Sequence, residues 1–144
     1  MKYFGFIKEH EDADYAVSMK DLIGESNCEN PHRAEVLSYL EKGKLCVPFM
    51  GCVENANDPN FDTELYDDDD FIAYLAIDTD GNWYWPRYIV TYLEKYPNMK
   101  IDCGFVTHVM ENANSEIRIP NEEISKLEKE YLEKAGFKKN DRDK

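Results

Sequence analysis

Basic residues are scarce in this sequence of 144 residues. Seventeen Lys and Arg stand against 30 Asp and Glu, which gives a formal net charge of −13 at pH 7. Because phosphate binding needs clustered Lys and Arg side chains, this deficit argues against nucleic acid as a partner. It argues equally against an anionic membrane surface. A cation or a basic protein would be attracted, although an acidic composition also serves solubility alone.

Long apolar runs are missing as well. No stretch approaches the roughly 18 apolar residues of a membrane span, and the run from Tyr3 to Ile7 is too short for the core of a signal peptide. The four cysteines form no C-x-x-C pair and fit no zinc spacing; they are Cys28, Cys46, Cys52 and Cys103. We therefore expect a cytoplasmic protein with reduced thiols and with no metal or cofactor.

Catalytic motifs are also lacking. The sequence contains no G-x-S-x-G, Walker or G-x-G-x-x-G loop. The histidines His10, His32 and His108 have no metal-binding spacing, and we expect His10 and His108 to be solvated. A Cys/His pair, such as Cys103 or Cys28 with His108 or His32, is an open alternative because such residues meet only in space. The inventory favours a non-enzymatic role over an uncharacterised enzyme.

What is present is a globular composition, with 42% hydrophobic and 13% aromatic residues. We expect one domain over residues 1–137 and a charged, frayed tail over 138–144. Hydrophobic periodicity and turn signals predict an α+β fold, a small and mostly antiparallel sheet with about four to five helices packed on it. The expected strands are 3–7, 44–50 (with an edge or a bulge, because of Pro48), 71–78 (buried on both faces) and 82–85. The expected helices are 17–23, 31–42, 86–96, 102–110 and 121–135.

The stretch from Thr79 to Tyr88 concentrates the strongest local signals. Asp80-Gly81 predicts a hairpin turn, and Trp83 and Trp85 alternate so that both indoles face one side of a strand. Pro86 is typical of a helix start. We expect a structural role for the motif, namely for Asp80, Gly81, Trp83, Trp85, Pro86, Tyr88 and Tyr92. The alternative is a stacking platform for a small molecule or a carbohydrate on Trp83, Trp85 and Tyr88.

Residues 54–70 hold eight acids and no Lys or Arg. Within this acidic segment, Glu64, Asp67, Asp68, Asp69 and Asp70 are the predicted partner-binding residues. Cation binding is weaker as an explanation, because consecutive side chains point in different directions. An EF-hand is excluded next to it: with Gly81 at the loop's glycine, Ala76 and Arg87 would fall on ligand positions.

One resemblance is carried by the same motif. Thr79-Asp80-Gly81-x-Trp83-x-Trp85-Pro86, followed by a tyrosine-rich helix through Tyr92 and Tyr96, is similar to a group of small bacterial proteins. Some of that group resemble the immunity proteins that accompany polymorphic toxins. The resemblance implies an acidic cytoplasmic interaction domain of immunity type, which binds and neutralises a toxin. It implies no catalytic residue.

Overall fold

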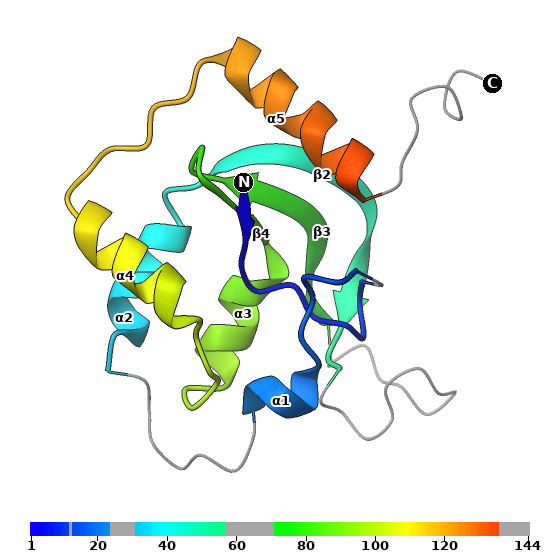
Figure 1. Ribbon diagram of the computed structural model, residues 1–144. Helices are drawn as coiled ribbons and strands as arrows, with labels where there is room; N and C mark the ends of the chain where they lie inside the picture. Colours follow the sequence, from blue (N-terminus) through cyan, green and yellow to red (C-terminus); the bar gives the residue numbers. More distant parts are fainter. Residues whose placement is uncertain (12, 24–30, 57–70, 136–144) are drawn as a thin grey trace.

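The computed structural model describes residues 1–11, 13–23, 31–56 and 71–135 (Figure 1). These residues form one α+β domain, as the sequence predicts. A four-stranded sheet has the order β1-β4-β3-β2. Its strands are β1 (Lys2–Tyr3), β2 (Lys44–Glu54), β3 (Phe71–Thr79) and β4 (Trp83–Pro86). The β2–β3 and β3–β4 pairs are antiparallel, and the short β1 runs parallel to β4.

Helices cover both faces of the sheet, but unequally. They are α1 (Met19–Ile23), α2 (Arg33–Leu40), α3 (Tyr88–Lys95), α4 (Cys103–Asn112) and α5 (Asn121–Lys134). The first four supply the larger apolar core on one face, whereas α5 lies across the other face and packs through Leu127 and Tyr131 (Figure 1). Among the described residues, no helix is long and apolar enough to cross a membrane.

Alternation along β4 explains how two cores arise from one strand. Trp83 and Trp85 belong to the core under α1–α4, while Tyr84 between them belongs to the core under α5. Successive side chains of a strand point to opposite faces, so three consecutive aromatic residues fill both layers. The expectation that the two indoles share a face is confirmed.

The first expected strand is shorter than its composition suggests. Gly5 has φ of 80° and packs so close to Ile89 that an added Cβ would lie 2.7 Å from that side chain. A positive φ is readily adopted only by glycine, so the chain turns there and pairing with β4 ends at Tyr3. Sequence periodicity could not reveal this turn, because it depends on a contact with α3.

The expected role of Pro86 is also corrected. Pro86 is the last residue of β4, paired with Ile77, and α3 begins two residues later at Tyr88. The amide of Arg87 donates to the carbonyl of Ala76 at 2.8 Å, which continues the sheet past the proline. Proline is compatible with either a strand end or a helix start, and here the sheet contact decides.

Candidate functional site

Asp80 is the centre of the most densely bonded polar cluster in the motif. Its Oδ1 accepts from the amides of Asn82 and Trp83, both at 2.8 Å, and so closes the β3–β4 turn. Gly81, with φ of 99°, supplies the positive backbone angle that this turn needs. Thr79 Oγ1 donates to the carbonyl of Trp83 at 2.7 Å. The turn is therefore built from side chains as well as backbone.

The other carboxylate oxygen of Asp80 accepts hydrogen bonds from two helices and so connects them to the turn. Its Oδ2 accepts from the hydroxyl of Tyr39 (α2) at 2.5 Å and from Nε2 of His108 (α4) at 2.6 Å. Burial, and then the adjacent Asp80 carboxylate, raises the pKa of Tyr39 above its usual range. His108 was expected to be solvated, but its side chain is only 17% exposed. Sequence reasoning missed this contact because its partners lie 41 and 28 residues from Asp80.

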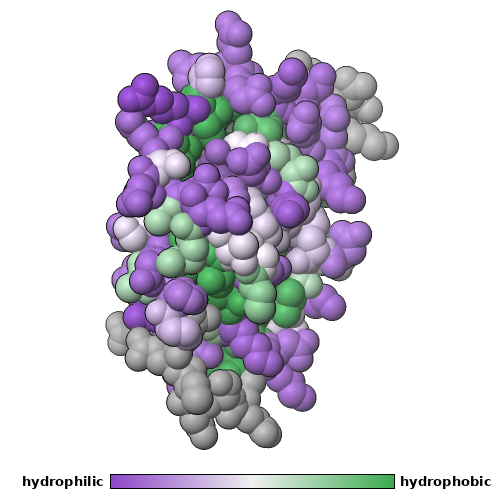
Figure 2. All heavy atoms as spheres, turned by 60° about the vertical axis from the view of Figure 1, so that its left-hand side comes forward, coloured by the Kyte–Doolittle hydropathy of each residue, from purple (hydrophilic) through white to green (hydrophobic). Residues whose placement is uncertain are grey.

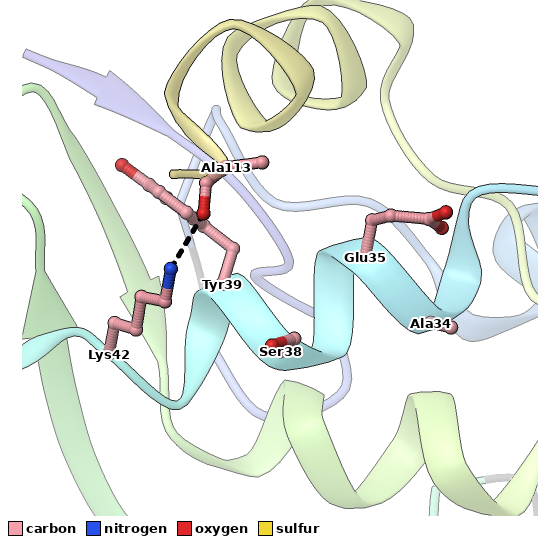
Figure 3. Close-up of a pocket in the computed structure, with 6 residues that line it drawn as sticks. All are labelled: Ala34, Glu35, Ser38, Tyr39, Lys42 and Ala113. Carbon is pink, nitrogen blue, oxygen red and sulfur yellow. Dashed lines mark hydrogen bonds between the residues drawn. The ribbon is translucent and has the colours of Figure 1, made fainter. Parts of the chain in front are cut away.

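A pocket of about 260 Å³ opens beside this cluster, between α2 and the end of α4 (Figure 3). Lys42 Nζ donates across it to the carbonyl of Ala113 at 2.7 Å. Figure 3 shows Glu35 and Lys42 at opposite ends of the pocket, so their charges do not converge. General acid–base chemistry needs groups that converge on one reacting atom. This pocket does not offer that arrangement.

The aromatic residues of the motif are packed inside. Trp83 is 6% exposed, and Trp85 and Tyr88 are fully buried. Stacking on a carbohydrate needs an exposed ring face. No such face is left on these three residues.

Three tyrosines spaced four residues apart, two on α3 and Tyr96 at its C-terminal cap, hold the loops that pass over the helix. The hydroxyl of Tyr88 accepts from the amide of Ile7 at 2.9 Å and donates to Glu11 Oε2 at 3.0 Å. The hydroxyl of Tyr96 accepts from Asn55 at 2.8 Å. Residues four apart on a helix lie on one face, so their hydroxyl groups form a single row.

Tyr92 is the most connected of the three. Its hydroxyl donates to the carbonyl of Glu54 at 3.1 Å, accepts from the amide of Ala56 at 2.9 Å, and lies 2.6 Å from Nε2 of His10. His10 was expected to be solvated; instead it is half-buried between the rings of Tyr88 and Tyr92. Burial lowers the pKa of His10 to about 4. Tyr92 therefore joins the N-terminal segment to the end of β2.

Asp78 and Arg87 form a two-point ion pair at the base of α3. Arg87 donates through Nε and one terminal nitrogen to the two carboxylate oxygens, at 3.1 and 2.7 Å. The Asp78 side chain is 9% exposed, whereas that of Arg87 is 47% exposed. Such a fork-shaped pair fixes geometry as well as charge. Arg87 borders an open groove of about 480 Å³ between β3 and α3, which Tyr74 and Glu41 also line.

The face of the sheet that carries Asp78 is not covered to its edge. Register pairs Leu45 with Asp78, Pro48 with Ala76, and Cys52 with Tyr74, and directly paired residues share a face. Asp78 and Ala76 are buried, but the remaining side chains of these three pairs are exposed. We call this set the apolar strip: Leu45, Pro48, Cys52 and Tyr74. The expectation that β3 is buried on both faces is wrong at Tyr74, which is 73% exposed.

Met50 stands next to the apolar strip and is 98% exposed. It lies where the β2–β3 register shifts between Pro48 and Cys52, beside Gly51 with φ of 104°. In the described part of the chain, β2 pairs with β3 alone, so its other edge is open. Proline, a bulge and a twisted edge oppose pairing with a further strand. A partner would therefore meet the face of β2 rather than its edge.

Elsewhere the surface is less concentrated. Figure 2 turns the left-hand side of Figure 1 forward and shows a mostly hydrophilic face crossed by a broken band of hydrophobic residues. Scattered apolar atoms are normal on a soluble protein and need no partner. The apolar strip differs because its members come from three pairs of the β2–β3 ladder that follow one another at alternate residues of β3, namely Tyr74, Ala76 and Asp78.

The remaining candidates are placed as follows. Glu64 and Asp67 to Asp70, the predicted partner-binding residues, lie outside the residues that the structure describes, as does Cys28. Cys46 is buried, and burial raises the pKa of its thiol to about 12, which opposes nucleophilic chemistry. In the described ranges, no group of three or more His, Cys, Asp and Glu side chains could hold a metal ion.

Comparison with known proteins gives no relative: no family model matches the chain, and neither the curated proteins nor the solved structures contain a match.

Proposed function

We propose that the protein is a small acidic interaction domain that binds a basic protein, most concretely an immunity-type inhibitor that binds and neutralises a toxin. The apolar strip is the observation that carries this proposal. Protein interfaces combine a contiguous apolar centre with a polar rim. The apolar strip and Met50 form the apolar centre. The half-exposed Arg87 and the exposed Glu41, which lie beside Tyr74, form part of the polar rim.

The position of the apolar strip adds support. Cys52 and Tyr74 sit at its far end, and the chain between them contains the acidic segment, residues 54–70. The apolar strip and the acidic segment thus belong to one β2–β3 unit in sequence. The part assigned to Glu64 and Asp67–Asp70 rests on the sequence alone.

Electrostatics provide the reason for a basic partner. Toxins that act on nucleic acid are basic at their clefts, and a partner with net charge −13 would be steered toward them. Apolar contacts would then set how long the complex lasts, because affinity differences within one interface lie mostly in dissociation. A bacterial cytoplasmic location is part of this proposal.

The test uses the product of a neighbouring toxin gene as the probe. We expect replacement of Asp67–Asp70 by Asn to slow association severalfold and to flatten its dependence on NaCl, since rim charges act mainly on encounter. The variant Tyr74→Ser should instead speed dissociation by roughly tenfold or more, as loss of a buried aromatic anchor does. Stopped-flow mixing at several salt concentrations measures both rates.

A matched control removes the same charge elsewhere. Glu111, Glu122, Glu123 and Glu133 are exposed on α4 and α5, and changing all four to Gln removes the same number of negative charges. This control should alter association less than the change at Asp67–Asp70. If the two variants slowed association equally, the acidic segment would act only through the total charge of the protein. Unaltered dissociation with Tyr74→Ser would remove the apolar strip from the interface.

A further inference from the structure

The turn at His10 and Glu11 is held by two tyrosines of α3. The amides of His10 and Glu11 both donate to the carbonyl of Ile7 at 3.0 Å, which folds the chain back over α3. His10 then contacts Tyr92, and Glu11 accepts from Tyr88. The returning chain is closed by Lys8 N to Val17 O at 3.0 Å and by Val17 N to Phe6 O at 2.9 Å.

The surroundings of Glu11 disfavour the charged form of its carboxyl group. It is half-buried, and the groups that face it are uncharged phenols: Tyr15 from the same segment, Tyr88 from α3 and Tyr131 from α5. Among the described residues, no Lys or Arg forms an ion pair with it. A desolvated carboxyl group without a cation favours its neutral form.

Among the described residues, no neighbouring cation offsets this preference. Burial raises the pKa of Glu11 to about 7, against the smaller opposing effect of the Tyr88 hydrogen bond. His10 cannot supply a cation at neutral pH, because burial holds its own pKa near 4. Asp14, whose charge acts on Tyr15 together with that of Glu11, adds a negative charge to the same segment.

We propose that the His10–Glu11 turn is a pH-sensitive clasp, in which the proton on Glu11 keeps residues 7–11 and 13–17 packed against α3 and α5. When this proton is lost near neutral pH, the charged carboxylate is more stable in water than in its half-buried position. The clasp then opens locally while the sheet stays folded. The clasp does not depend on the proposed partner.

Hydrogen exchange at two amides tests the clasp directly. We expect the protection factors of Lys8 and Val17, corrected for intrinsic exchange, to fall about tenfold between pH 6 and pH 8. That change follows if Glu11 titrates near pH 7 when packed and near 4.5 when released. The amide of Thr79 in β3 should keep its protection. The variant Glu11→Gln should hold Lys8 and Val17 protected at both pH values.

Glu111→Gln is the control, since it removes one exposed acid from α4, which carries none of these tyrosines. It should reproduce the wild-type loss of protection. A carbon-13 titration of the Glu11 carboxyl in the wild-type chain gives a second readout that needs no variant. Titration near pH 4.5, or equal loss of protection in Glu11→Gln and wild type, would overturn the proposal.

Discussion

At the scale of single residues, Gly43 sets the closest packing constraint on the motif. A Cβ added there would lie 2.3 Å from Cζ2 of Trp85, a fully buried ring. Because such a ring has no space to retreat into, a larger residue must displace it or the turn after α2. The glycine between α2 and β2 is thus a packing surface for the indole.

Gly43→Ala should therefore lower the free energy of unfolding by about 1–3 kcal/mol, the usual cost of overpacking a core. Urea unfolding measures the loss, and the emission spectrum of tryptophan reports the displaced ring. Gly51→Ala is the control, since nothing lies within 4 Å of its added Cβ and its cost is backbone strain at φ of 104°. An unchanged emission spectrum in Gly43→Ala would contradict the assigned contact.

Individual residues also show which contacts could be predicted from the sequence and which could not. The turn role of Asp80 and the shared face of Trp83 and Trp85 follow from local rules, and the structure has both. The contacts of Asp80 with Tyr39 and His108 do not, because they depend on how α2 and α4 pack. A histidine on the polar side of a predicted helix looks solvated until its neighbours in space are known.

At the scale of elements, α3 organises the loops through its row of tyrosines. Tyr92 satisfies the backbone of Glu54 and Ala56, and it also contacts His10. The hydroxyl of Tyr96, at the C-terminal cap of α3, accepts a hydrogen bond from the side chain of Asn55. The two residues therefore form a natural pair for hydroxyl deletion.

Tyr92→Phe should cost about 1–3 kcal/mol of stability, because it leaves part-buried backbone groups without their partner. Tyr96→Phe should cost less, about 1 kcal/mol, since it removes one hydrogen bond to a side chain instead of two to the backbone. Chemical denaturation compares the two, and hydrogen exchange at Ala56 locates the effect. Equal costs, with Ala56 still protected in Tyr92→Phe, would refute the anchoring role.

Elements were predictable where their signal is local. The α+β class, the β3–β4 hairpin and the cap of α4 by Asp102, whose side chain accepts from Gly104 N at 2.7 Å, all follow from pattern and turn chemistry. The apolar strip had no such signal. Its residues look like core by composition, and only the extent of the helical layer leaves them uncovered. The parallel pairing of β1 with β4 is likewise set by tertiary contacts.

At the scale of the whole molecule, His10 and Glu11 give opposite contributions to stability as pH changes. The pKa of Glu11 is raised from 4.5 to about 7, so its contribution is present below pH 4.5 and is lost as pH rises through 7. The pKa of His10 is lowered from 6.5 to about 4, so its contribution is present above pH 6.5 and is lost as pH falls through 4. Between pH 4.5 and 6.5, rising pH therefore lowers the stability contributed by Glu11 and raises the stability contributed by His10.

Single variants should therefore show separately how the contribution of each residue to stability depends on pH. Relative to wild type, Glu11→Gln should gain stability as pH rises from 5 to 7, and His10→Gln should lose it over the same range. Each slope is bounded by about 1.4 kcal/mol per pH unit, the limit for one proton. Other carboxyl groups contribute alike to all three proteins and cancel in the differences. Urea unfolding at pH 5, 6 and 7 gives the three curves. Parallel curves would mean that neither group titrates differently on folding, whereas curves that diverge in opposite directions establish two adjacent residues whose pH responses offset each other.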